Sequence, residues 1–320
     1  MNGYAWPGLA GLSTGLGAAL AMALLGPLLA RAAPGAWMRL LGWSGVLLSA
    51  ALGPFLVPHE PAGNRMLLQC ALLYFAMKVL VQAEARLAGR RVPTGLAWLG
   101  FAFLWPGMRP WAFTGARAPS RGGARWVREG LLSMLLGAAM LVDAHLLVRA
   151  GVHDAWVAVV AMGGLGFVIA FGAMRVQAGL WRMAGRRVQP VFDEPLKATS
   201  LVEFWTRRWN LAFSEMLQVT VERPVRRKLG PRLSFTLAFL ASGLLHDLAF
   251  SVPARGGYGL PTLYFVLHAT LVALEPRIPW QRLPGGRHLR HAAAVLAVLG
   301  LVPLLFHLPA MRALVIPLVD

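Results

Sequence analysis

Long apolar runs separated by basic segments constrain this chain more than any other feature. A helix needs about 20 apolar residues to cross the hydrocarbon core of a bilayer. The chain has eight runs near that length, which predict an all-α fold: a polytopic transmembrane bundle of about 8 spans. The runs are 8–30, 38–57, 66–85, 130–148, 155–174, 233–252, 260–275 and 291–309.

Two further segments do not fit the pattern of simple spans. The run 94–106 is too short to cross comfortably and ends in Trp105-Pro106-Gly107, so we expect it to be re-entrant or interfacial. Segment 175–232 mixes aromatic residues with arginines, which is typical of helices lying in the membrane interface. Within it, Ser200 or Thr199 can cap a helix and Glu203 can complete a capping box. That helix would run from about residue 201 to about residue 222.

Composition supports one integral membrane domain over residues 1–320. Charged residues make up 14% of the chain, whereas a soluble domain is nearer a quarter. The net charge of +18 would suit a nucleic-acid-binding protein, but topology explains it. With the N-terminus outside, 26 of the 31 Lys and Arg residues fall in the inside loops, as the positive-inside rule predicts. We therefore expect a lipid bilayer and no nucleic acid as partner, and the Ala, Arg, Gly and Leu bias suggests a bacterial inner membrane.

Polar side chains inside a bilayer are expensive and are therefore candidates for function. His246 is the sharpest, because Phe239, Ser242, Gly243 and Phe250 share its helical face. An imidazole at that depth can act as a general base, although a lone histidine on such a face is more often a packed structural residue.

The other polar residues within the spans carry weaker signals. Lys78 could extend its ammonium towards the interface, and Asp143 and His145 lie near the end of their span. His268 could be packed in the core or line a cavity. The single cysteine, Cys70, allows neither a disulfide nor a cysteine-based metal site, and we expect no metal.

A second constellation lies at 203–210. On a continuous helix, Trp205, Arg208 and Trp209 would form one stripe, with Glu203 and Asn210 on the neighbouring side. Periodicity alone favours an interfacial anchor, with tryptophans at the headgroups and arginines on phosphates.

These residues carry a resemblance to a known family. The segment from Phe192 to Asn210 contains Pro-Leu-Lys-Ala-Thr-Ser-Leu and Phe-Trp-Thr-Arg-Arg-Trp-Asn, and Ser-Gly-Leu-Leu-His-Asp follows at 242–247. In this order and spacing they resemble the wax synthase branch of the membrane-bound O-acyltransferase superfamily. The resemblance covers about 190–252. Thr206 stands where the branch usually has Gly, and Asp247 where Glu is common.

The resemblance implies transfer of a fatty acyl group from acyl-CoA to an alcohol hydroxyl, forming an ester without a cofactor. It implies His246 as the catalytic histidine and general base, and Asn210 as the second catalytic position. Acyl-CoA and a hydrophobic alcohol would be the substrates; the sequence does not indicate an oligomeric state. The expected substrate-binding residues are Trp205, Arg207, Arg208, Trp209, Ser242 and His268.

Two other functions fit the same sequence. The acceptor could be a glycan, a lipid headgroup or the hydroxyl of a metabolite, because the shape of the reaction chamber decides the acceptor. Alternatively, the chain could be a non-catalytic lipid transporter, which would not need His246 and Asn210 together.

Overall fold

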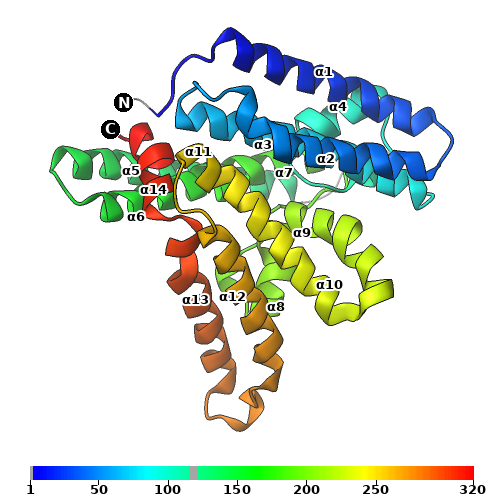
Figure 1. Cartoon of the computed structure of the whole chain (residues 1–320). Helices are drawn as coiled ribbons and strands as arrows, with labels where there is room; N and C mark the ends of the chain where they lie inside the picture. Colours follow the sequence, from blue (N-terminus) through cyan, green and yellow to red (C-terminus); the bar gives the residue numbers. More distant parts are fainter. Residues whose placement is uncertain (1–2, 116–121) are drawn as a thin grey trace. The chain divides into compact units, whose positions relative to one another are not determined.

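The computed structural model describes residues 3–115 and 122–320. Within those ranges the chain is helical and contains no strand, which confirms the predicted all-α class. Arg117 and Arg121, two of the basic residues counted in the predicted inside loops, lie outside the described residues. The described chain forms two compact units, and Figure 1 shows the helices of both. Unit 1 comprises residues 1–190 and 311–320, and unit 2 comprises residues 191–310.

Seven helices among the described residues are long and apolar enough to cross a membrane. They correspond to seven of the eight predicted spans. The eighth, predicted at 260–275, is the 15-residue helix α12 (Leu260–Leu274). The seven candidate spans are Leu9–Arg31, Ala36–Leu56, Ala62–Leu87, Gly123–Arg149, Asp154–Met183, Leu211–Ala254 and Gly286–Leu305.

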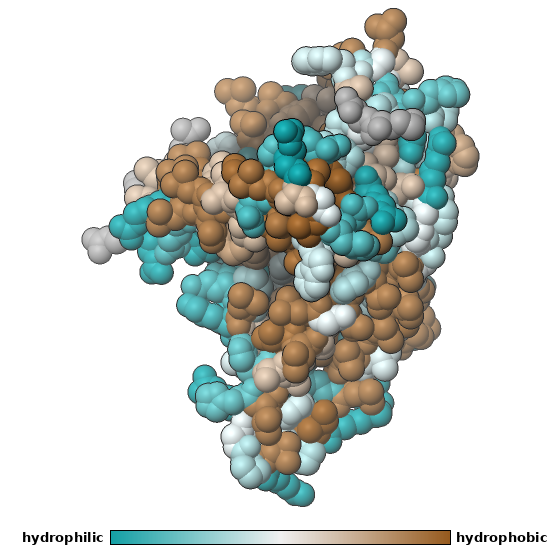
Figure 2. Space-filling view, turned by 90° about the vertical axis from the view of Figure 1, so that its left-hand side faces the viewer, coloured by the Kyte–Doolittle hydropathy of each residue, from teal (hydrophilic) through white to brown (hydrophobic). Residues whose placement is uncertain are grey.

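The outer faces of these helices are apolar, as expected for surfaces in contact with lipid. Helix α5 (Gly123–Arg149), for example, exposes Leu132, Leu135 and Leu146. In the lower part of Figure 2, where the hairpin of α12 and α13 (Gly286–Leu305) lies, hydrophobic residues cover much of the sides and hydrophilic residues gather at the tip. Apolar sides with polar ends are what a membrane-spanning element requires.

In unit 1, α1 (Leu9–Arg31) and α2 (Ala36–Leu56) pack against α3 (Ala62–Leu87), as Figure 1 shows. The short helix α4 (Gly95–Phe103) packs on α1. At 1.5 Å per residue its nine residues span only about 13 Å. Its length agrees with the expectation that 94–106 does not cross the membrane.

Lys78 on α3, which the sequence allowed to extend towards the interface, is enclosed by the protein instead. Its side chain is fully buried, and its ammonium donates hydrogen bonds to the carbonyl oxygens of Phe101, Trp105 and Gly107 at 2.7–2.9 Å. These carbonyls follow or end α4, where the last helical C=O groups lack intrahelical partners. Lys78 therefore caps α4 from the neighbouring helix.

A glycine seam joins α5 to α6 (Asp154–Leu165), η2 (Gly166–Ala173) and α7 (Met174–Met183). The buried residues of α5 are Gly123, Gly130, Gly137 and Ala144, spaced by seven residues. A Cβ atom on Gly137 would lie 2.6 Å from the carbonyl oxygen of Gly164. Small residues thus allow the backbones to touch, a packing mode common between membrane helices.

Unit 2 contains the signature segment, by which we mean the motifs between Phe192 and Asp247 that carry the family resemblance. Helix α10 (Arg223–His246) packs against α12, which packs against α13. An aromatic core lies among them and includes Phe204, Trp205, Phe239, Tyr264 and Phe265. The shorter elements are η3 (Pro195–Lys197), α8 (Leu201–Glu203), η4 (Phe204–Arg208), α9 (Leu211–Leu217), η5 (Gln218–Glu222), η6 (Asp247–Ser251) and α11 (Val252–Ala254).

Candidate active site

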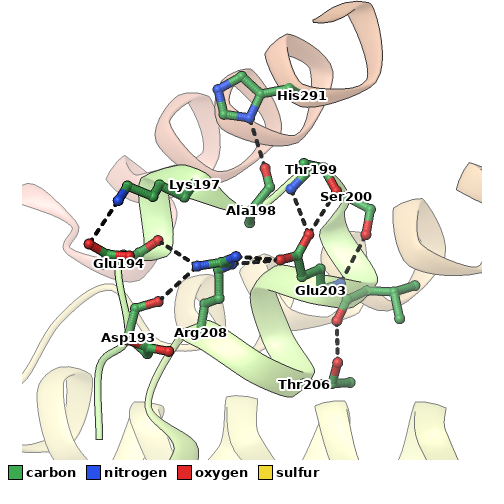
Figure 3. Close-up of polar contacts among 11 residues, drawn as sticks. Asp193, Glu194, Lys197, Ala198, Thr199, Ser200, Glu203, Thr206, Arg208 and His291 are labelled. Carbon is green, nitrogen blue, oxygen red and sulfur yellow. Dashed lines mark hydrogen bonds and ion pairs between the residues drawn. The ribbon is translucent and has the colours of Figure 1, made fainter. Parts of the chain in front are cut away.

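The predicted cap at the start of the signature segment is present. Ser200 is the N-cap of α8, and its hydroxyl accepts a hydrogen bond from the Glu203 amide at 3.0 Å. The Glu203 carboxylate reaches back to the amide and hydroxyl of Thr199, at 2.9 and 2.7 Å (Figure 3). Just after the end of α12, the buried Glu275 carboxylate accepts from the Leu201 amide. The start of this helix is therefore fixed by local caps and by a distant acid.

The single helix predicted from about 201 to about 222 is wrong. After α8 the chain makes one turn of π-helix, closed by the Trp209 amide on the Phe204 carbonyl. Asn210 then takes φ 39°, a left-handed conformation in which asparagine is several-fold enriched. The helix restarts at Leu211 and, with only the kink at Gly230, continues into α10. The break separates Asn210 from the helical register of Glu203.

Arg208 holds this break in place. Its guanidinium pairs with the Glu203 carboxylate at 2.7 Å and also donates to the carbonyl oxygens of Asp193 and Glu194, each at 3.4 Å (Figure 3). The backbone reinforces the arrangement, because the Asp193 amide donates to the Arg208 carbonyl at 2.9 Å. Of the two predicted substrate-binding arginines, Arg208 has its side chain engaged within the protein and Arg207 is exposed.

The Glu203–Arg208 pair should stabilise unit 2 in a pH-dependent way. Hydrogen bonds from Thr199 and the Arg208 charge lower the pKa of Glu203 from 4.5 to about 2. A carboxyl whose pKa is depressed by folding contributes its full stability above pH 4.5 and loses it as pH falls towards 2. We expect Glu203→Gln to cost about 1.5–3 kcal/mol at neutral pH, the range for hydrogen bonds to charged groups.

Thermal unfolding of the purified protein in detergent measures this effect. The difference in unfolding temperature between wild type and Glu203→Gln should become smaller as the pH is lowered from 4.5 towards 2. The exposed pair of Lys197 and Glu194 provides a control, since Glu194→Gln should change stability little. A difference in unfolding temperature that stays constant over this pH range would contradict the proposed ionic role of Glu203.

His246 ends α10 with its imidazole in an aromatic setting. Nδ1 lies 2.7 Å from the Ser242 carbonyl oxygen. A carbonyl only accepts, so Nδ1 carries the hydrogen and the neutral ring presents the Nε2 lone pair. The ring also packs against Phe265 and Phe213, with centroids 4.6 and 5.6 Å away. This tautomer is the one that a general base acting through Nε2 requires.

Asn210 is linked to His246 through one aromatic residue. The Asn210 Oδ1 atom accepts from the Phe213 amide at 3.3 Å, which caps α9, and the Phe213 ring meets the His246 ring. The two predicted catalytic residues therefore contact the same residue, Asn210 through the Phe213 backbone amide and His246 through the Phe213 ring. With Oδ1 engaged in the cap, the Nδ2 hydrogens are the part of the amide suited to donate to a substrate oxygen.

The remaining predicted substrate residues are buried or packed against the core of unit 2. Trp205 and His268 are buried and their ring centroids are 5.2 Å apart, while Ser242 is buried on α10 and holds His246 through its carbonyl. Trp209 stacks on Phe204, with centroids 5.4 Å apart. The core thus contains Trp205, His268 and Ser242.

Asp247 has a role that the sequence did not reveal. Its carboxylate accepts from the amides of Gly259 and Thr262, at 2.8 and 3.1 Å, and from the Thr262 hydroxyl. It therefore caps the N-terminus of α12 from the residue after His246, which ties the histidine to the helix that carries His268. Asp247 and Gly259 are twelve positions apart, which hides this cap from the sequence because capping is read from local spacing.

A buried serine–histidine pair, Ser251 and His307, is not arranged for nucleophilic catalysis. His307 Nδ1 accepts from the Ala310 amide at 3.2 Å, so Nε2 carries the hydrogen and faces the Ser251 hydroxyl at 3.1 Å. The serine donates to the Gly257 carbonyl at 3.2 Å. A base would need a lone pair where this histidine has a proton, so the pair fastens a loop. No group of three or more potential metal ligands occurs among the described residues.

Comparison with known proteins bears on the same segment. Residues 188–267 match the profile of the membrane bound O-acyl transferase family. The match contains every predicted site residue from Trp205 to His246 and ends one residue before His268.

The relatives confirm the resemblance to the wax synthase branch. "Probable long-chain-alcohol O-fatty-acyltransferase 2" of Arabidopsis thaliana is 37% identical over 128 residues, 36% of each chain. "Long-chain-alcohol O-fatty-acyltransferase" of Simmondsia chinensis is 42% identical over 101 residues, 28% of each chain. "Acyl-CoA--sterol O-acyltransferase 1" of Arabidopsis thaliana is 39% identical over 98 residues, covering 28% of this chain and 27% of the relative. The chain thus spans about a third of the length of the curated relatives it matches.

Proposed function

We propose that this membrane protein transfers a fatty acyl group from acyl-CoA to the hydroxyl of a hydrophobic alcohol. The observation that carries the proposal is the tautomer of His246, whose Nε2 lone pair lies in an aromatic setting within the segment that matches the acyltransferase family. The relatives named above act on long-chain alcohols or sterols by their names, which supports an apolar alcohol as acceptor.

The proposed reaction is direct transfer in a ternary complex. His246 Nε2 takes the proton from the acceptor hydroxyl, and the oxygen attacks the thioester carbonyl carbon. The C–S bond breaks as the ester C–O bond forms, and the coenzyme A thiolate leaves with the proton returned from His246. Asn210 donates through Nδ2 to the developing oxyanion, a contribution of about 10²–10³ in rate for one such donor.

The basic residues of the predicted inside loops are the proposed binding site for coenzyme A. Arg207 is exposed next to the break at Asn210, so it is the arginine of the signature best suited to contact the phosphates of coenzyme A. Coenzyme A would approach from the side of the membrane that carries the basic loops, which the predicted topology places inside the cell. The outside position of the N-terminus and a bacterial inner membrane stay predictions.

Membranes containing the protein test this function when they are given acyl-CoA with a panel of alcohols. We expect release of free coenzyme A together with an ester of one or more long-chain alcohols or sterols, identified by mass spectrometry. Membranes without the protein provide the blank. Release of coenzyme A with a glycan, headgroup or metabolite ester would change the acceptor class. An absence of coenzyme A release with every acceptor would contradict acyl transfer and favour a lipid transporter.

A further inference from the structure

Two buried polar atoms in unit 2 have no hydrogen-bond partner within the described chain: the Trp205 Nε1 and the His268 Nε2. Trp205 is 8% exposed and His268 is 0% exposed. Buried polar side-chain atoms are rarely left without a partner, because each costs about 1–3 kcal/mol. Two such atoms on rings whose centroids are 5.2 Å apart indicate that they bind a polar group from outside the chain.

The chemistry of the two atoms specifies that group. An indole N–H can only donate. His268 Nδ1 lies 3.0 Å from the Tyr264 carbonyl oxygen, so Nδ1 carries the hydrogen and Nε2 can only accept. A hydroxyl satisfies both atoms, because it accepts from Trp205 and donates to His268. A carbonyl or ether oxygen satisfies Trp205 alone.

The surroundings indicate that the hydroxyl is carried on an apolar chain. The Trp205 ring is flanked by Phe239, Tyr264 and Phe265, with centroids 5.4–6.2 Å away. Phe265 also contacts His246, so one phenyl ring lies against both the predicted base and this polar pair. The pair therefore belongs to the same aromatic core as the proposed reaction site.

One hydroxyl cannot serve both histidines. In the proposed reaction, the hydroxyl that reacts gives its only proton to His246 Nε2, so it has none to donate to His268 Nε2. We propose that Trp205 and His268 bind a second hydroxyl of the acceptor, and that the acceptors are apolar chains carrying two hydroxyl groups. This inference rests on the proposed acyl transfer.

The first experiment varies the acceptor with the wild-type protein in membranes. Hexadecanol is compared with a set of hexadecanediols whose second hydroxyl lies at different carbons, with acyl-CoA as donor. We expect the best diol to exceed hexadecanol by about tenfold in kcat/KM, the size of one to two net hydrogen bonds. Its methyl ether at the second hydroxyl should keep only part of this gain, because it accepts from Trp205 but cannot donate to His268.

The second experiment compares variants by the ratio of diol to hexadecanol kcat/KM. Trp205→Phe and His268→Leu should each bring this ratio close to one, and His268→Gln, which retains an acceptor, should restore part of it. Trp181→Phe is the matched control, since that indole N–H already donates to the Leu104 carbonyl at 2.7 Å. Its ratio should equal that of wild type.

The outcomes separate this inference from the proposed function. Transfer to hexadecanol with no preference for any diol overturns the second hydroxyl site and leaves acyl transfer standing; the two atoms then bind water. A methyl ether that is as good an acceptor as the diol also overturns it, because the proton of the second hydroxyl would then not be needed. If no alcohol accepts an acyl group, the proposed function itself fails.

Discussion

The His246→Ala variant is expected to lose ester formation by about 10²–10⁴-fold, the usual contribution of a positioned general base. The physical reason is the contact between Nδ1 and the Ser242 carbonyl oxygen, which fixes the hydrogen on Nδ1 and leaves Nε2 to accept the acceptor proton. Alanine removes the only proposed proton acceptor for the reacting hydroxyl. The measurement is ester formation by membranes adjusted to equal protein content.

A matched control is available in unit 1. His145 Nδ1 lies 2.8 Å from the Val319 carbonyl oxygen, so His145 has the same kind of carbonyl contact as His246. It lies outside the segment that matches the acyltransferase family. His145→Ala should therefore retain ester formation. Full activity of His246→Ala at normal membrane levels would remove the histidine from the mechanism.

The same assay tests Asn210, but alanine is the wrong substitution. Asn210 has φ 39° and caps α9, so alanine would add backbone strain to the loss of the amide. Asn210→Gly tolerates that φ and costs the cap only a few tenths of a kcal/mol. We expect Asn210→Gly to lose about 10²-fold in rate with nearly unchanged stability, and unchanged activity would contradict the oxyanion role.

The sequence predicted the fold class and most spans because membrane insertion depends on long apolar runs. It also predicted the cap at Ser200, because a capping box is a local pattern. The break at Trp209–Asn210 escaped prediction. Periodicity continued the helix through Asn210, whereas the contact that stabilises the break, from Arg208 to the Asp193 and Glu194 carbonyls, joins residues 14 and 15 positions apart.

Other site features depend on partners that spacing does not reveal. His246 stood out from the sequence, but its tautomer came from the structure, through the carbonyl of Ser242. Asp247 directly follows His246 in the sequence, and only the structure shows that its carboxylate caps α12. The resemblance supplied the role of Asn210; its indirect link to His246 through Phe213 required coordinates.

Lys78→Met is expected to have the largest effect on stability in unit 1. Methionine is close to lysine in length and apolar, so it fills the site without an ammonium. It leaves the Phe101 and Gly107 carbonyls without the bonds that Lys78 donates at 2.9 and 2.7 Å, whereas the Trp105 carbonyl keeps its bond from the Tyr74 hydroxyl. Two buried carbonyls at about 1–3 kcal/mol each predict a loss of about 2–6 kcal/mol.

Tyr74→Phe is the matched control for this site. It removes one hydrogen bond to the Trp105 carbonyl, which Lys78 still reaches at 2.7 Å, so it should cost only about 0.5–1.5 kcal/mol. Thermal or denaturant unfolding in detergent ranks the three proteins. A Lys78→Met protein as stable as Tyr74→Phe would mean that the ammonium does not hold the end of α4. We expect wild type to be the most stable, Tyr74→Phe to be intermediate and Lys78→Met to be the least stable, because Lys78 acts as a helix cap. A lysine whose side chain reached the interface would tolerate replacement by methionine.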